Sequence, residues 1–341
     1  MKHVLIALCL LAACATGATG EDSDEPAPTA RIIDPGGCPD WGCGANSATV
    51  GDGLIFDELD SSMVTPNRGG LKIAGAKLVD GTPVTMRVWR DILYAVGRDG
   101  AIYFDSQLIG TIIILKHPVY GAYEAQIAVV KTQALTFWAG AHDPVRFYEI
   151  RTRKLGETKF AQYACRSELT SDPTWSTDPH LAIVFQGDRY DATYKKVTET
   201  SPSDPWFNIA CAATAPAKMH LMRHTRAGSY DASGAIAYDT SIPQRTALLK
   251  MYTADYCGTG HVFTVDGTPL SYQDRNHWVP MPPYIAKESV WTETGAACLD
   301  TPRYVDLGTI YSVCGFVPPS CGTISWPWES VGYAFSAIPP P

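Results

Sequence analysis

The chain has 341 residues, of which 45% are hydrophobic, and a net charge of −8 at pH 7. This length and composition suffice for one large folded domain or two, and they exclude an intrinsically disordered chain. The acidic balance, with no basic stretch to neutralise phosphates, excludes nucleic acid as a partner.

The first 13 residues have the organisation of an export signal. A short charged head precedes an apolar run over residues 4–13, which is too short for a permanent transmembrane helix. The run ends in Leu11-Ala12-Ala13-Cys14, the pattern of a bacterial lipobox, so we expect removal of residues 1–13 and lipidation of Cys14. Ala15, in place of Asp, favours the outer membrane of a Gram-negative envelope. The alternative is an ordinary secretory signal cut after Ala18 or Gly20.

The mature chain divides by composition into three parts. Residues 14–30 are small, acidic and proline-containing, and we expect a disordered tether between the lipid and the folded body. Residues 31–200 are expected to be rich in β-strands, and residues 201–341 to form an α+β region packed on them. No later stretch is long and apolar enough for a transmembrane helix.

Between about Gly70 and Glu199 the sequence predicts seven short strands. They are rich in β-branched and aromatic residues, often alternate, and are separated by turn signals such as Asp80-Gly81 and Asp99-Gly100. The segments are 71–79, 83–89, 101–105, 111–116, 124–130, 145–152 and 180–186. This pattern indicates an antiparallel sandwich or barrel.

After residue 201 the pattern changes and predicts two helices. The first covers 208–225, with Asn208 as its cap, unless Pro216 marks a later start capped by Thr214. The second opens at Pro243 and ends at Gly258, with Cys257 in its last turn. A hairpin is then expected over 263–272, followed by a loop-rich tail. The fold class is α+β, braced by disulfides.

The cysteines predict that brace. Ten cysteines, less Cys9 in the signal and Cys14, leave an even number in an exported chain, which implies oxidised pairs. These are Cys38, Cys43, Cys165, Cys211, Cys257, Cys298, Cys314 and Cys321. Two pairs, Cys38–Cys43 and Cys314–Cys321, are close enough in the sequence to close short turns. The other four allow three connectivities, and none of the pairs has the CxxC spacing of a zinc or redox site.

Several stretches together resemble one family. "MYTADYCGTGHVFTVDGTPL" (251–270) is similar to the signature of the bacterial ADYC-domain proteins, named for Ala254-Asp255-Tyr256-Cys257. The stretches 208–225, 291–303, 41–47 and 56–59 also resemble that family. The resemblance implies an exported, lipid-anchored envelope protein, and it assigns no catalytic residue.

Two enzyme hypotheses compete with a binding or structural role. Cys211 in the first turn of a helix would have a stabilised thiolate, with His261 or His277 as its base, which is the arrangement of a thiol-dependent hydrolase. Cys257, at the negative end of its helix, is the weaker nucleophile.

The second enzyme hypothesis is a metal site. His220 and His224 stand four apart, the spacing of two ligands on one helix face, although no third ligand is evident. We favour a lipid-anchored binding or structural module with no cofactor, whose ligand is an envelope protein or a polysaccharide that stacks on aromatic side chains.

Overall fold

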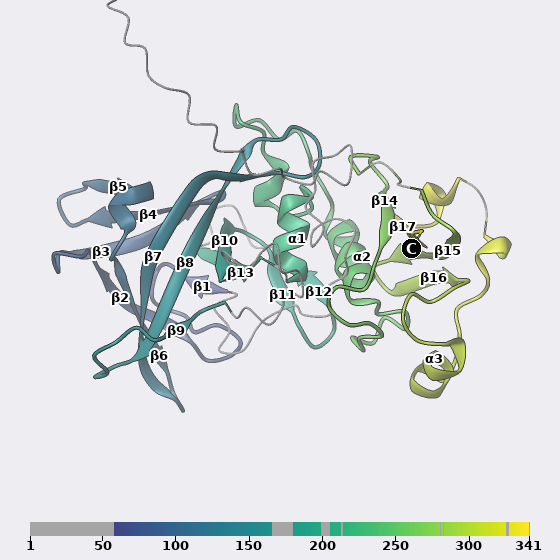
Figure 1. The fold of residues 1–341 in the computed structure, drawn as a ribbon, viewed down its shortest axis with the longest axis horizontal. Coiled ribbons are helices and arrows are strands. Elements are labelled where there is room, and N and C mark those ends of the chain that lie inside the picture. The colour runs from purple at the N-terminus through teal and green to yellow at the C-terminus, as the bar shows by residue number, and fades with distance from the viewer. Residues whose placement is uncertain are drawn as a thin grey trace, which may run out of the picture. The chain divides into compact units, whose positions relative to one another are not determined.

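The largest element of the structure is an antiparallel sheet of eleven strands (Figure 1). The computed structural model describes residues 58–165, 180–198, 205–212, 214–279, 281, 283–324 and 327–340, all within one compact unit, Ile32–Pro341. Ten strands follow the order β1-β13-β10-β8-β7-β6-β2-β3-β4-β5, and β9 pairs with β8. Their bounds are Leu59–Asp60 (β1), Lys72–Lys77 (β2), Pro83–Trp89 (β3), Ile92–Gly97 (β4), Ile102–Phe104 (β5), Ile112–His117 (β6), Gly121–Thr136 (β7), Pro144–Lys154 (β8), Gln162–Tyr163 (β9), Leu181–Gln186 (β10) and Trp206–Cys211 (β13).

All seven expected strands are present, as β2, β3, β5, β6, β7, β8 and β10. Gly81 and Gly100 take the positive φ values, 89° and 85°, that the turn signals predict. Strand β4 was not predicted. It follows β3 after only Arg90 and Asp91, a turn without glycine or asparagine in which Arg90 itself has a φ of 59°.

The sheet bends over upon itself. Strand β10 is buried on both faces, so that Ile183 contributes to one hydrophobic cluster and Val184 to the other. Strands β3 and β4 pack against β10 across the second cluster. The N–H of Leu93 in β4 donates to the hydroxyl of Tyr148 in β8 at 3.0 Å. These contacts give the sheet the barrel-like form expected from short antiparallel strands.

Strand β13 occupies residues that were expected to begin a helix. Phe207, Ile209 and Cys211 alternate into one cluster, while Ala210 belongs to the other. This period of two outweighs the alanine-rich composition, so a helix starting from Asn208 is wrong. The later start is confirmed, because helix α1 (Ala215–Leu221) has Thr214 at its N-cap and Pro216 in its first turn. Strand β13 also extends the large sheet beyond residue 200.

A second antiparallel sheet of four strands lies in the later part of the chain (Figure 1). Its order is β14-β17-β15-β16, with bounds Ser271–Asp274 (β14), Ala286–Thr292 (β15), Gly295–Leu299 (β16) and Ala334–Ile338 (β17). A separate two-stranded sheet joins Arg189–Asp191 (β11) and Lys196–Thr198 (β12). The expected hairpin over 263–272 is wrong, because β14 pairs with β17 near the chain's end rather than with a strand across the Asp266-Gly267 turn.

Helix α2 (Ile242–Thr253) lies between the two large sheets (Figure 1). Ser241 Oγ accepts a hydrogen bond from the N–H of Gln244 at 3.2 Å and so caps the helix. Pro243 lies in the first turn, as expected. Every residue from Gln244 to Thr253 is buried, because α2 contacts α1 and β12 as well as β15 and β17. A helix packed on all sides has no single apolar stripe.

The structure adds a third helix, α3 (Leu307–Cys314), to the two that were predicted, in the tail expected to be loop-rich. Asp306 caps it, and Gly315 ends it with a φ of 76°. Four short 3-10 helices complete the described residues. They are Asp105–Leu108, Ala227–Ser229, Cys321–Thr323 and Trp328–Ser330.

Candidate functional site

The four residues Ala254–Cys257 form the turn that leaves helix α2. The helix ends at Thr253, five residues before the expected Gly258, because Ala254 takes a left-handed conformation with a φ of 50°. Cys257 therefore lies beyond the helix and not in its last turn. From this turn the next three side chains reach three different segments of the protein.

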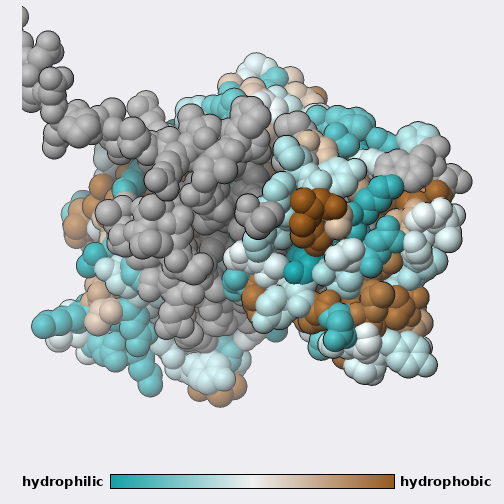
Figure 2. Space-filling view, turned by 45° about the vertical axis from the view of Figure 1, so that its right-hand side comes forward, coloured by the Kyte–Doolittle hydropathy of each residue, from teal (hydrophilic) through white to brown (hydrophobic). Residues whose placement is uncertain are grey.

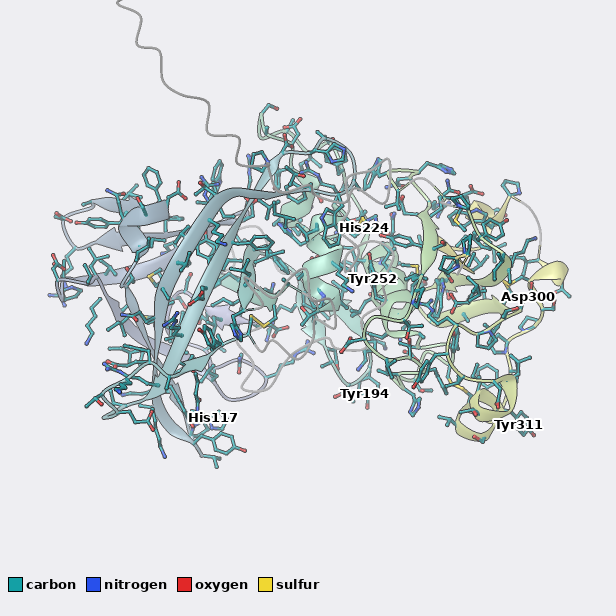
Figure 3. The ribbon with its side chains drawn as sticks, in the orientation of Figure 1. His117, Tyr194, His224, Tyr252, Asp300 and Tyr311 are labelled. Carbon is teal, nitrogen blue, oxygen red and sulfur yellow. A yellow bond between two sulfur atoms is a disulfide. The ribbon has the colours of Figure 1, made fainter. Side chains whose placement is uncertain are left out.

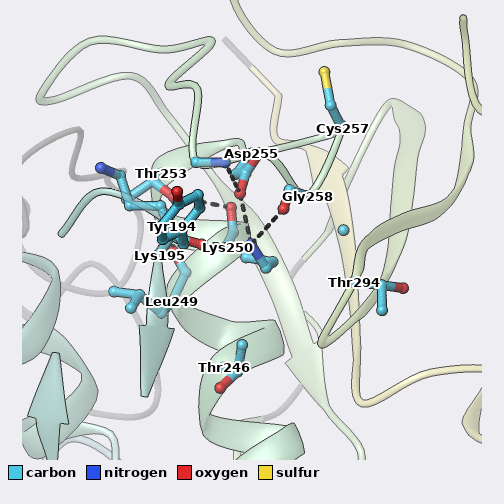
Figure 4. Close-up of polar contacts among 12 residues, drawn as sticks. Tyr194, Lys195, Thr246, Leu249, Lys250, Thr253, Asp255, Cys257, Gly258 and Thr294 are labelled. Atoms are coloured by element: carbon cyan, nitrogen blue, oxygen red, sulfur yellow. Dashed lines mark hydrogen bonds and ion pairs between the residues drawn. The ribbon is translucent and has the colours of Figure 1, made fainter. Parts of the chain in front are cut away.

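Asp255 forms a buried ion pair with Lys250 of helix α2 (Figure 4). Lys250 Nζ donates to Asp255 Oδ2 at 2.7 Å, to the Tyr194 carbonyl at 2.9 Å and to the Gly258 carbonyl at 3.3 Å. The N–H of Gly260 donates to the same carboxylate oxygen at 2.9 Å. Neither charged side chain is exposed to solvent. Three acceptors for three ammonium protons make this a structural pair, which fixes the turn to the loop before β12.

Tyr256 joins the turn to the second sheet. Its hydroxyl donates to Glu288 Oε1 in β15 at 2.6 Å, and Arg303 Nε donates to the same oxygen at 2.6 Å. The Tyr256 ring stacks on Trp291, with centroids 5.3 Å apart. Burial, followed by the charge of Glu288, raises the pKa of Tyr256 well above its ordinary value. Tyr256 is therefore a buried hydrogen-bond donor.

Cys257 forms a disulfide with Cys314, the last residue of helix α3, across a Cα–Cα distance of 5.7 Å. Cys298 of β16 pairs with Cys321, and both lie in the hydrophobic cluster beneath the second sheet. The expected Cys314–Cys321 closure is therefore wrong. Cys314 and Cys321 are near in the sequence, but Cys314 is bonded to the turn after α2 and Cys321 to strand β16. Cys38, Cys43 and the lipidation residue Cys14 lie outside the described residues.

The thiol hypothesis depended on Cys211, and the structure places that residue differently. Cys211 ends strand β13 and is bonded to Cys165, with Cα atoms 5.3 Å apart, so no thiol and no helix start are present there. His261 is exposed and packs on Phe263, and His277 pairs with Glu329 at 3.2 Å. A sulfur in a disulfide cannot act as a nucleophile, so these three residues do not form a catalytic group.

The two histidines of the metal hypothesis are both fully buried. Helix α1 ends at Leu221, before His224, so the pair does not share a helix face. His220 stacks on Phe185 with centroids 4.7 Å apart, and its Nδ1 lies 2.9 Å from Thr225 Oγ1. Burial lowers the pKa of His220 to about 3 and that of His224 to about 4. Among the described residues no three metal-ligating side chains gather.

A pocket of about 190 Å³ opens where three turns of the chain meet. The turns are the β3–β4 connection, the end of β10 and the segment that follows α1. Its lining residues, which we call the arginine pocket, are Trp89, Arg90, Gln186, Gly187, Arg226, Ala227 and Tyr230. Two arginines, an amide and two aromatic residues thus line this space.

Arg90 is held rigidly at this pocket. Its guanidinium carbon lies 4.3 Å from the centroid of the Trp89 ring and 4.6 Å from that of Tyr230. The guanidinium also donates to the carbonyls of Asp231 at 3.4 Å and Gly234 at 3.2 Å. No carboxylate of the described residues forms an ion pair with it. A fixed guanidinium with unused N–H donors is suited to bind an anion.

No residue of the arginine pocket was predicted from the sequence. The only local signal was Trp89-Arg90 at the end of an alternating strand, where an exposed ring is followed directly by a cation. Arg226 and Tyr230 come from a segment more than a hundred residues later, and only the tertiary fold brings them together.

The geometry defines a disulfide-braced α+β protein whose signature residues hold the fold together. A sequence-family model described as the ADYC domain matches residues 105–305. The chain belongs to the ADYC-domain family. Comparisons with curated proteins and with solved structures gave no match.

Proposed function

We propose that this ADYC-domain protein is a lipid-anchored binding module of the bacterial cell envelope. The lipobox pattern of Leu11-Ala12-Ala13-Cys14 supports this proposal, in which residues 1–13 direct export and Cys14 carries the lipid. Three disulfides among the described residues support an oxidising compartment. Within the described residues, no helix has the length and apolarity needed to cross a bilayer.

We propose that the arginine pocket is the binding site, and that its ligand is an acidic saccharide of the envelope. The observation that carries this proposal is the Arg90 guanidinium, fixed between two rings and unpaired with any described carboxylate. A carboxylate on a sugar would accept from the guanidinium, while the exposed Trp89 ring offers a face for the apolar side of the sugar. Arg226, whose guanidinium lies 3.9 Å from Asp239 Oδ1, also lines the pocket.

Calorimetric titration of the full chain carrying Cys14→Ser tests the binding site. Trigalacturonate should bind, while maltotriose, a neutral trisaccharide, should not. Arg90→Gln should weaken the affinity roughly 10- to 100-fold, because hydrogen bonds to a charged group are lost. Arg98→Gln is the matched control, since it removes one exposed positive charge outside the pocket lining. Equal losses in both variants, or no heat with trigalacturonate, would refute the assignment.

Intact mass of protein extracted from envelopes tests the anchor separately. The expected species lacks residues 1–13 and carries acyl groups on Cys14, and Cys14→Ser should release the protein from the membrane fraction. A mature protein that begins after Ala18 or Gly20 would contradict the anchor but would leave the pocket proposal standing.

A further inference from the structure

An uncharged stretch of the chain lies on the protein surface around helix α3. Residues 307–324 contain no Asp, Glu, Lys, Arg or His. Within α3 only Ile310 is fully buried. Five large side chains of this region, between 41% and 61% exposed, form what we call the α3 face. They are Tyr304, Leu307, Tyr311, Val313 and Phe316.

The exposed apolar side chains of α3 border the stripe by which the helix packs on the body. Ile310 and Cys314 are four residues apart and form this stripe. Leu307 and Tyr311 flank this buried stripe on one side and Val313 flanks it on the other, and Figure 3 shows Tyr311 at the edge of the molecule. In Figure 2, brown hydrophobic residues gather low on the right, the side on which Figure 1 places α3. Gathered exposed apolar side chains of this kind mark an interaction surface.

The α3 face is presented rigidly. Asp306 Oδ1 accepts from the N–H of Thr309 at 2.6 Å, which caps the helix start, and Gly315 closes its end. The disulfide between Cys314 and Cys257 fastens the helix to the family motif. Because the apolar side chains are already ordered, a partner that covers them faces a smaller entropic penalty.

We infer that the α3 face inserts into the surface of the lipid bilayer in which Cys14 is anchored, an inference that rests on the proposed lipid anchor. Asp306 is the only Asp, Glu, Lys, Arg or His between residues 304 and 324, so insertion of this stretch desolvates almost no charge. Tyr304 and Tyr311 are suited to the boundary between headgroups and acyl chains. A single attachment point at Cys14 gains strength from a second apolar contact.

The expected tether before the folded body permits this contact. Residues 15–30 would span at most roughly 55 Å when fully extended. The anchor therefore does not dictate which side of the body meets the membrane, and the apolar α3 face can decide the orientation. A net charge of −8 and the absence of basic side chains on the face make attraction to anionic headgroups an unsuitable driving force.

Vesicle flotation of the full chain carrying Cys14→Ser tests this inference without a contribution from the acyl chains. Phosphatidylcholine vesicles should carry the protein, and phosphatidylglycerol or low salt should not increase the bound fraction. Adding Leu307→Ser, Tyr311→Ser and Phe316→Ser should lower the partition coefficient by roughly tenfold per side chain. The matched control adds Val64→Ser and Val119→Ser, two exposed apolar residues outside this face, and should bind like the parent.

The alternatives give different results. Equal binding by both variant sets, or binding that requires anionic lipid and is lost in salt, would overturn the inference. A chain that ignores vesicles but forms a dimer abolished by the α3 substitutions would show that a second copy covers the face, and would equally overturn it. If the Cys14→Ser chain floats while the native protein proves unacylated, the α3 inference stands and the proposed anchor fails. All substituted positions are exposed, so the fold is expected to survive in each variant.

Discussion

Lys250 Nζ and Asp255 Oδ2 are 2.7 Å apart, and neither side chain is exposed to solvent. The pair joins the last turn of α2 to the residue that gives the family motif its second letter. When one partner is removed, the other charge remains buried without compensation. Substituting either residue alone should therefore lower the free energy of unfolding by more than the intact pair contributes to it.

We therefore expect Lys250→Met to destabilise the protein by about 3–5 kcal/mol, measured by urea unfolding of the oxidised chain. Lys154→Met, at an exposed lysine, should change the free energy of unfolding by less than about 0.5 kcal/mol. The double variant Lys250→Met/Asp255→Leu should recover part of the loss, because no charge then stays buried. A single variant as stable as the parent would contradict the structural role of the pair.

Gly258 provides a second test of the motif turn. It has a φ of 73°, and a Cβ there would lie 1.7 Å from the Thr294 carbonyl oxygen, so Gly258→Ala requires the backbone to move. We expect a severe loss, above about 3 kcal/mol, with reduced yield of the oxidised protein. Gly81 has a similar φ of 89° but open space around it. Gly81→Ala should lose only about 1 kcal/mol, and equal effects in thermal unfolding would disprove the steric argument.

The disulfide connectivity is open to direct chemical test. Peptide mapping without reduction should yield Cys165–Cys211, Cys257–Cys314 and Cys298–Cys321 linkages. Cys257→Ser should add one reactive thiol, at Cys314, to those of the parent and lower the stability by about 4 kcal/mol, as expected for a loop that spans 57 residues. A recovered Cys314–Cys321 peptide would contradict the structure.

Because His220 and His224 are buried, we expect the stability of the fold to depend on pH. The pKa of His224 is lowered to about 4, first by burial and then by Arg245, against an opposing effect of Asp274. Because the folded value lies below the ordinary 6.5, the unfolded chain binds more protons, and stability is complete above pH 6.5 and falls as the pH drops towards 4. His224 alone should account for up to about 3 kcal/mol of this loss.

His224→Phe should remove that part of the pH dependence. Neither ring nitrogen of His224 has a hydrogen-bond partner among the described residues, so stability at pH 7 should be nearly unchanged. NMR titration gives an independent readout, since the His220 and His224 ring protons should not shift between pH 5 and 8. A titrating His224 signal in that range would show that its ring is hydrated.

The β-rich architecture could be predicted from the sequence because its strands alternate. β13 was missed because two alanines and a following "ATAPAK" outweighed the alternation of Phe207, Ile209 and Cys211. β15 and β17 were missed because residues such as Ser289, Ser336 and Ala334 carry no apolar pattern. Both strands are buried by tertiary packing, which their local sequence does not report.

The candidate site was less accessible to prediction than the fold. The motif residues were recognised, but their partners Lys250, Tyr194, Glu288 and Arg303 are fixed by long-range contacts. Likewise, Arg90 and Tyr230 meet only because the large sheet curls towards the segment after α1. The disulfide pairing also depends on long-range contacts. Cys314 and Cys321 are near in the sequence but do not bond to each other, and each is bonded to a more distant cysteine.

The position of β17 has a consequence for the part of the chain that the family shares. The matched residues 105–305 contain β14 and β15 but not β17, the strand that lies between them. They also contain Cys257 and Cys298 without Cys314 and Cys321. Excised at those limits, the polypeptide would have a gap in its second sheet and two orphan sulfurs, and we expect it to aggregate. Any relative whose flanks diverge is therefore expected to contribute a replacement strand and its own pair of thiols.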